Sequence, residues 1–152
     1  MNKYRPPREA CMMETARIWA ERSTCNRLKV GSVIEKEGRI ISLGYAGSPQ
    51  GLPHCLDEGC IIDKLREGCV RTLHSELNSL CFAAKNGISV NGATMYVTIS
   101  PCIDCAKVIV ASGIKRIYYD QEYRDIKGIE YLKKAGLSVL KYSYKFEKEE
   151  GE

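Results

Sequence analysis

The sequence predicts an α/β protein of three layers, α/β/α, in which helices cover both faces of a five-stranded mixed sheet. This prediction rests on the order of the helical and strand-like segments along the chain, which is α-β-β-loop-α-β-α-β-α-β. The 152 residues are 44% hydrophobic and 28% charged, as in a globular protein. We therefore expect one domain, residues 1–152.

The first elements are a helix and a hairpin. Pro6 and Pro7 are suited to a first helical turn, and apolar residues then recur at helical spacing to about Arg22. KVGSVIE and RIISLGY are short segments typical of strands, and Glu37-Gly38 joins them as the two strands of a hairpin. These segments predict a helix followed by a β-hairpin.

About 27 residues after Tyr45 show no convincing period. A loop of that length without structure is uncommon in a compact domain and needs a function or a cross-link. This segment holds three cysteines, which could provide the cross-link.

The second half alternates helices and strands. Thr72 is a candidate N-cap for a helix that runs to Lys85, with Gly87 as its stop. The segments after it are expected to be a strand, a helix, a strand, a helix and a strand: ATMYVTI, PCIDCAKVIVASG, IKRIYYD, KGIEYLKKAG and LSVLKYS. Residues 143–152 are predicted to be a frayed, charged tail.

Composition narrows the environment and the partners. No apolar run approaches the roughly 20 residues that span a bilayer, and the first residues lack the apolar stretch of a signal peptide. We therefore expect a cytoplasmic protein with no membrane partner, in which eight cysteines indicate metal binding or catalysis rather than disulfides. The net charge of +4 suits an anionic small molecule and is too small to indicate nucleic acid.

A catalytic zinc site is predicted at the starts of two helices. Cys102 and Cys105 are spaced so that both sulfurs can face one metal, and a helix N-terminus favours their thiolate forms. His74, also at a helix start, can supply a third ligand. Three protein ligands leave the fourth tetrahedral position of zinc for water, as in catalytic sites.

Glu76 is the candidate catalytic residue. Two thiolates weaken zinc as a Lewis acid, so the water needs a nearby base, and Glu76 follows the His74 ligand by two residues. CxxC alone is more often a redox motif or a closed structural zinc. The joint pattern, H-S-E before one helix and P-C-I-D-C before the next, is the signature of zinc nucleobase deaminases.

Over about residues 10–142 the chain resembles the deoxycytidylate (dCMP) deaminases, in particular their bacterial and viral branch. The stretches that carry the resemblance are RSTCNRLKVGSVI, GYAGSPQGLPHC, RTLHSELNSL, GATMYVT, PCIDCAKVIVASGIKRIYY and EYRD. The resemblance implies a cytidine deaminase-like fold and hydrolysis of dCMP to dUMP and ammonia, which supplies the thymidylate precursor. It also implies a homo-oligomer, with a hexamer as one form, and dCTP and dTTP as effectors. Deamination of dCTP is a further activity to expect, and Mg²⁺ would accompany any nucleoside triphosphate.

Three residues depart from the family pattern. Ser75 and Ser79 stand where alanine is common, which is a small steric change. Ala46 replaces an asparagine that the family associates with nucleotide and effector recognition. This last departure argues against control by dCTP and dTTP.

The remaining cysteines predict a second, structural zinc. Four of them could close the long loop as a Cys₄ site: Cys25, Cys55, Cys60 and Cys69. The family resemblance supports Cys25 and Cys55, whereas Cys60 and Cys69 are inferred from this sequence. His54 is an alternative ligand. Cys11 and Cys81 lie at apolar helical positions and are expected to be core residues.

Candidate substrate contacts are cationic and aromatic. Tyr123 and Arg124 match a family position associated with substrate binding, and the pair suits a ring and a phosphate. Arg27 is a second candidate for the phosphate. Lys85 and Arg71 could instead serve an effector or a subunit interface.

Two other functions compete with nucleotide deamination. A deaminase of RNA or single-stranded DNA would need a stronger basic stripe and aromatic stacking platforms. A zinc module for protein interaction would have no use for a carboxylate beside an open ligand position, so Glu76 argues against it.

Overall fold

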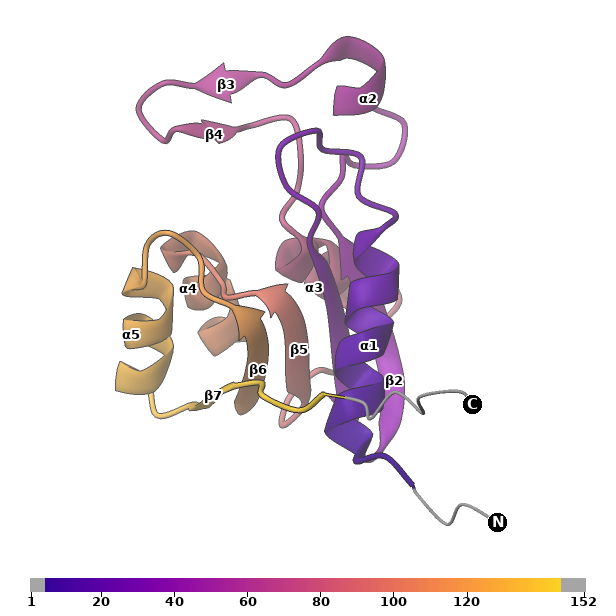
Figure 1. Ribbon diagram of the computed structural model, residues 1–152, viewed down its shortest axis with the longest axis vertical. Helices are drawn as coiled ribbons and strands as arrows, with labels where there is room; N and C mark the ends of the chain where they lie inside the picture. Colours follow the sequence, from indigo (N-terminus) through magenta and orange to yellow (C-terminus); the bar gives the residue numbers. More distant parts are fainter. Residues whose placement is uncertain (1–4, 146–152) are drawn as a thin grey trace, which may run out of the picture.

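The computed structural model describes residues 5–145, which form a five-stranded sheet in the order β2-β1-β5-β6-β7 (Figure 1). The strands are β1 (Gly31–Lys36), β2 (Arg39–Tyr45), β5 (Thr94–Ile99), β6 (Arg116–Gln121) and β7 (Ser138–Lys141). β1 pairs antiparallel with β2 and β5, whereas β5, β6 and β7 run parallel. The predicted mixed sheet is confirmed.

Helices cover both faces of this sheet. The helices that pack on it are α1 (Arg8–Ala20), α3 (Ser75–Lys85), α4 (Ile103–Ser112) and α5 (Lys127–Lys134). On one face α1 buries Met13 against Val33 and Tyr96. On the other face α3, α4 and α5 enclose a larger core that contains Ile34 and Met95. Neighbouring residues of β1 thus point to opposite faces, as strand geometry requires, and the three-layer arrangement is confirmed.

The hairpin between β1 and β2 turns at the predicted place. Glu37 and Gly38 both have positive φ, 53° and 78°. Such angles at two central residues match the right-handed twist of the flanking strands. The Gly38 N–H donates to the carboxylate of Glu35, which fixes the turn.

The predicted start of α3 at Thr72 is wrong. The N-cap residue is His74, with extended backbone angles. Leu73 and Gly47 exchange backbone hydrogen bonds in a β-bridge, which keeps the chain extended up to His74. The helix ends as predicted, with Gly87 just beyond it at φ 66°.

The expectation that Cys11 and Cys81 are core residues is also wrong, because both are exposed. In α1 the buried face includes Ala10 and Met13, and in α3 it includes Leu80. Each residue of a helix is rotated about 100° from the one before it, and this rotation places Cys11 and Cys81 outside the buried faces. An apolar residue next to the buried face of a helix is therefore not always part of the core.

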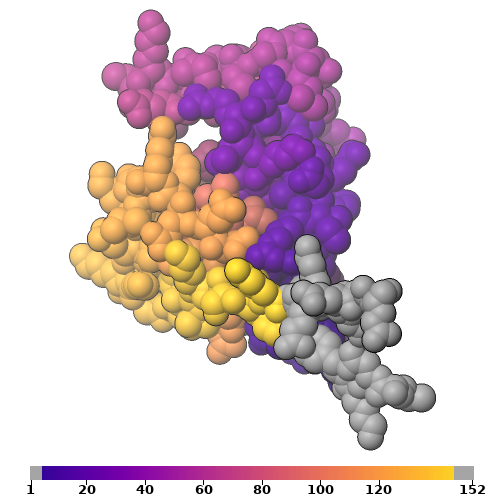
Figure 2. All heavy atoms as spheres, viewed as in Figure 1, coloured from indigo at the N-terminus to yellow at the C-terminus, as the bar shows by residue number. Residues whose placement is uncertain are grey.

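The long loop after Tyr45 contains short elements that the sequence did not predict. Residues 50–70, which we call the arm, hold α2 (Cys55–Glu58) and a two-stranded sheet of β3 (Ile62–Asp63) and β4 (Gly68–Cys69). The arm projects beyond the end of the main sheet at which β5 and β6 finish (Figure 1). Figure 2 shows a hollow between the magenta arm and the orange C-terminal half.

Two glycines let α3 and α4 take their positions. A Cβ on Gly44 of β2 would lie 2.2 Å from the carbonyl oxygen of Ser75, at the start of α3. A Cβ on Gly128 of α5 would lie 1.9 Å from the carbonyl oxygen of Pro101, just before α4. Neither approach is open to a residue with a side chain, so these glycines set where the two helices begin.

The charged tail is described only in part. Tyr144 packs beside Tyr142, with ring centroids 6.5 Å apart, so the chain is held against the α1 face to that point. The predicted fraying of residues 146–152 falls outside the described residues. Among the helices of residues 5–145, none has the length and apolar character needed to cross a membrane.

Candidate active site

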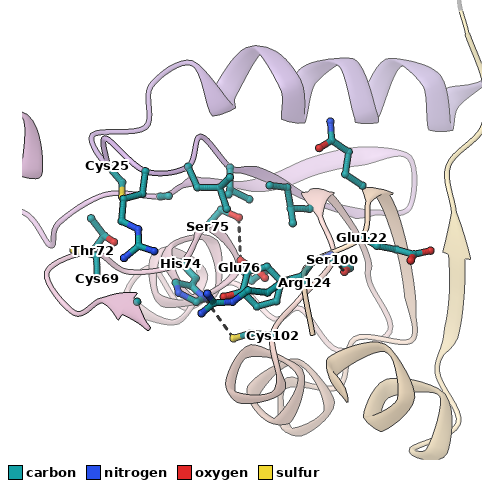
Figure 3. A pocket seen from close by; sticks show the side chains of 18 of the residues that line it. Cys25, Cys69, Thr72, His74, Ser75, Glu76, Ser100, Cys102, Glu122 and Arg124 are labelled. Carbon is teal, nitrogen blue, oxygen red and sulfur yellow. Dashed lines mark hydrogen bonds between the residues drawn. The ribbon is translucent and has the colours of Figure 1, made fainter. Parts of the chain in front are cut away.

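Three potential metal ligands meet where two helices begin. His74 is the N-cap residue of α3, Cys102 is the N-cap residue of α4, and Cys105 lies in the first turn of α4. The Nδ1 atom of His74 lies 3.5 Å from the Sγ of Cys102 (Figure 3). The same atom lies 3.4 Å from the Sγ of Cys105. The structure therefore brings all three predicted ligands together.

The spacing of these atoms fits zinc. Zinc–nitrogen and zinc–sulfur bonds in a tetrahedron place the two ligand atoms about 3.6 Å apart. The two observed distances agree with this value to within a few tenths of an ångström. One nitrogen and two sulfurs within 4.8 Å of one another form a donor set that zinc prefers.

The contacts among the three groups also shift their pKa values. The hydrogen bond with Cys102 raises the pKa of His74 to about 9, against the effect of burial. The hydrogen bond with Cys105 lowers the pKa of Cys102 to about 4, and the same contact raises the pKa of Cys105. These pKa shifts favour the thiolate of Cys102 at neutral pH, whereas metal binding has to release the protons of both Cys105 and His74.

Glu76 lies in the first turn of α3, beside these ligands. Its side chain is 3% exposed, and this burial raises the pKa of its carboxyl group. The Oγ of Ser75 donates a hydrogen bond of 3.1 Å to its Oε2 (Figure 3). A carboxyl whose pKa moves toward neutrality can both accept and return a proton, as general acid–base chemistry requires.

His74, Glu76 and Cys102 line one cavity of about 400 Å³. Its walls come from the segment before β1, the arm, the starts of α3 and α4, and the segment after β6. Figure 3 shows side chains from these segments around it. The volume lies within the range of small-molecule sites.

All three predicted substrate contacts line this cavity: Arg27, Tyr123 and Arg124. The guanidinium of Arg124 stacks over the ring of Tyr123, with its Cζ 5.6 Å from the ring centroid. Both arginines also donate hydrogen bonds of 3.2 Å to the backbone of the arm, at Glu67. Cationic groups from two separate segments therefore face the same space.

Two residues of the cavity were missed from the sequence. The Oγ of Ser100 accepts a hydrogen bond of 2.7 Å from the backbone N–H of Tyr123, which fixes the segment after β6. Ser100 directly precedes the Pro101-Cys102 motif, and this position could have indicated from the sequence that it lies at the site. Glu67 reaches the cavity only because the arm folds back, and no local pattern indicates that.

The four other predicted ligands also come together: Cys55, Cys60 and Cys69 of the arm, and Cys25 from the segment before β1. We call them the arm cluster. The sulfurs of Cys25, Cys55 and Cys60 lie within 4.8 Å of one another, and Cys69 Sγ is 3.6 Å from Cys55 Sγ. Sulfurs of a tetrahedral ZnS₄ site are about 3.8 Å apart. His54 instead caps α2, where its backbone N–H donates to Asp57.

The pKa values of two of these thiols shift in opposite directions. Burial, and then the contact with Cys69, raise the pKa of Cys55 to about 12. Burial also acts to raise the pKa of Cys69, but hydrogen bonds from the Arg71 backbone and from Cys55 outweigh it and lower the pKa to about 7. One member of the group is therefore ready to bind a metal as a thiolate.

Helices that open with H-x-E and P-C-x-x-C, and that meet at one cavity with a buried glutamate, define a class of enzyme. This class is the zinc-dependent nucleobase deaminases. The family model of the cytidine and deoxycytidylate deaminase zinc-binding region matches residues 7–121. The chain therefore belongs to the cytidine and deoxycytidylate deaminase family, and the predicted family is confirmed.

Relatives cover most of the chain. It is 41% identical over 128 residues to ComE operon protein 2 of Bacillus subtilis, spanning 84% of this chain and 67% of that protein. It is 36% identical over 167 residues to the deoxycytidylate deaminase of Enterobacteria phage T4, spanning 85% and 86%. The dCMP deaminase of cyanophage S-TIM5, in complex with dCMP and dUMP, superposes with a TM-score of 0.81 at 35% identity, covering 91% of this chain and 99% of that one.

Proposed function

We propose that this chain catalyses the hydrolytic deamination of dCMP to dUMP and ammonia, which supplies the precursor of thymidylate. The observation that carries the proposal is the buried carboxyl of Glu76 beside His74, Cys102 and Cys105 in a cavity that also holds cationic side chains. The choice of substrate is supported by the phage T4 relative, named a deoxycytidylate deaminase, and by the S-TIM5 complex with dCMP and dUMP.

In this proposal His74, Cys102 and Cys105 hold a catalytic zinc. Zinc with three protein ligands supplies Lewis acidity that makes water a better nucleophile at neutral pH. Glu76 takes a proton from the water that adds to C4 of cytosine and delivers it to ring nitrogen N3. Glu76 then passes the second proton to the amino group, so the C4–N bond breaks and ammonia leaves. The new C4–O bond makes the product uracil.

The nucleotide's phosphate is read by Arg27 and Arg124, with Tyr123 beside the sugar or ring. Both guanidinium groups line the cavity that Glu76 shares. Hydrogen bonds between a guanidinium and a phosphate are charge-assisted and stronger than neutral ones. The monophosphate is therefore preferred over the free nucleoside, and dCTP is a weaker second substrate that brings Mg²⁺ with it.

A second zinc is bound by the arm cluster: Cys25, Cys55, Cys60 and Cys69. The arm has little core of its own, since only Cys55 of α2 is buried. Metal binding would supply the stability that packing does not. The chain thus holds two zinc ions, one catalytic and one structural.

The same arm supports self-association. It exposes several large apolar side chains, among which Leu65 is 97% exposed. The others are Leu52, Leu56, Ile61, Ile62 and Val70. Exposed apolar patches on a small protein mark interaction surfaces. We infer a homo-oligomer, of which a hexamer is one form. Ala46, 7% exposed in the cavity wall, offers no side-chain hydrogen bond to a nucleotide, so dCTP and dTTP are weak effectors at best.

The direct test is ammonia release by purified, zinc-loaded protein from dCMP, dCTP, CMP, deoxycytidine and a cytosine-containing single-stranded DNA. We expect dCMP to react fastest and deoxycytidine far more slowly. Faster release from the DNA would favour a polynucleotide deaminase. No release from any of them, with both metals bound, would favour a zinc module without catalysis.

A further inference from the structure

One backbone oxygen of the arm joins the two arginines that face the cavity. The carbonyl oxygen of Glu67 accepts a hydrogen bond of 3.2 Å from Arg27 Nη2 and another of 3.2 Å from Arg124 Nη2. The two guanidinium nitrogens are therefore no more than twice that distance apart. Residues separated by 97 positions in sequence thus become one pair of positive charges, small enough for a single phosphate group to touch both.

The side chain of Glu67 bears on the same pair. Its carboxylate oxygen lies 3.5 Å from Arg124 Nη1, while the side chain itself is 77% exposed at the cavity rim. Each guanidinium has five N–H donors, so these contacts leave donors free on both arginines. The carboxylate therefore stands beside the cationic pair without saturating it.

The backbone of Glu67 is unusual for this residue type. Its φ of 51° is left-handed, and Glu37 is the only other non-glycine residue with positive φ among residues 5–145. Glycine adopts this conformation most readily, and one stands next in the chain, at Gly68. The arm thus holds Glu67 in a conformation that glycine would adopt at lower cost.

The negative charge of the Glu67 carboxylate limits how many phosphate groups of a nucleotide can bind next to it. One phosphate group can lie between the two arginines, where attraction to two positive charges outweighs repulsion from one carboxylate. A chain of three phosphates has to extend past that point, and like charges held close together disfavour binding. The other acidic side chain of the cavity rim, Glu122, is already paired with Lys141 at 3.2 Å.

We propose that Glu67 determines the phosphate specificity of the cavity. Its carbonyl oxygen gathers Arg27 and Arg124 into a subsite for one phosphate group, and its carboxylate repels the second and third phosphates of a triphosphate. This inference rests on the proposed function and adds to it a residue that selects nucleoside monophosphates over triphosphates.

Glu67→Gln tests the carboxylate, because it keeps the size of the side chain and removes only its charge. The ratio of kcat/KM for dCTP to kcat/KM for dCMP should rise about tenfold, which is the effect of roughly 1.4 kcal/mol. Binding of inorganic tripolyphosphate, measured by calorimetry, should tighten by a similar factor, and binding of inorganic phosphate should change less. Glu58→Gln is the matched control, because it removes the same charge from the arm at a residue that pairs with Arg71 outside the cavity. It should change neither the ratio of the two kcat/KM values nor the binding of tripolyphosphate.

Glu67→Val and Glu67→Gly test the backbone contact. Valine is strained at positive φ and should turn the carbonyl away, which should raise KM for dCMP by a much larger factor than it lowers kcat/KM for deoxycytidine. Glycine keeps the conformation and should behave as glutamine does. A zinc content equal to wild type shows that the arm is folded in each variant.

Unchanged ratios in Glu67→Gln, or an unchanged KM for dCMP in Glu67→Val, would overturn the inference. Either result with an active wild type leaves the deaminase function standing. A wild type that does not deaminate dCMP refutes the function itself.

Discussion

The close approach of α5 to the start of α4 makes Gly128→Ala a test of how the site is positioned. The new methyl group would lie 1.9 Å from the carbonyl oxygen of Pro101 and 2.9 Å from the carbonyl carbon of Cys102. Ordinary contacts begin at 3.4 Å, so the two backbones have to separate by roughly 1.5 Å. The displaced segment carries Cys102, one of the proposed ligands.

The expected losses follow from that displacement. Overpacking of this kind costs about 1–3 kcal/mol of stability, which lowers Tm by about 2–4 °C for each kcal/mol in a chain of this size. A shift of about 1 Å in a catalytic group can cost about 100-fold in rate. We therefore expect Gly128→Ala to lower kcat/KM for dCMP by about 100-fold, measured by ammonia release, and to release zinc to a chelator more quickly.

A matched variant separates the site from general stability. A Cβ on Gly31 would lie 2.0 Å from the carbonyl oxygen of Ala16 in α1, on the opposite face of the sheet. Gly31→Ala should therefore lower Tm by a similar amount with a much smaller loss of kcat/KM. If Gly128→Ala keeps both Tm and kcat/KM near wild type, or if the two variants lose activity equally, then α5 does not position Cys102 in this way.

Three further predictions concern the phosphate and the second metal. Arg124→Ala should lower kcat/KM for dCMP by about 10- to 150-fold, since a charge-assisted hydrogen bond is worth about 1.5–3 kcal/mol, and the 49% exposure of the side chain favours the lower end. Its activity on deoxycytidine should not change; equal losses on both substrates would mean that Arg124 shapes the cavity instead. Wild-type protein should contain about two zinc ions per chain by elemental analysis. A single zinc ion in protein whose cysteines are all reduced would rule out a zinc site in the arm cluster. Cys60→Ser should lose one of the two zinc ions and lower Tm, while His74, Cys102 and Cys105 keep the catalytic zinc. An unchanged zinc content would show that Cys60 is not a ligand.

Much of the fold could be predicted because its signals are local. The short strand segment of β1 and the helical spacing in α1 are each recognised from a few neighbouring residues, and the turn at Glu37-Gly38 from two. The proposed metal ligands were equally accessible, since short motifs at helix starts place His74 and Cys102 at the same end of the sheet.

What could not be predicted depends on contacts between distant segments. Thr72 was expected to cap α3, but a β-bridge to Gly47 delays the helix by two residues. The arm shows no helical or strand periodicity, because contacts among its cysteines and with Arg27 and Arg124 fix its conformation. The position of Glu67 at the cavity could therefore not be predicted from the local sequence. The outward orientation of Cys11 was a smaller error, of one position on a helix.

In the proposed zinc-dependent deamination of dCMP, Glu76 moves the protons, and Glu76→Gln tests this role. The measurement is dUMP and ammonia formed per minute by wild type and variant, with zinc content determined on the same samples. We expect equal zinc content and a rate lower by about 10²- to 10⁴-fold, because general acid–base catalysis contributes that much. A variant that keeps its zinc and more than about a tenth of the wild-type rate would show that Glu76 does not move the protons.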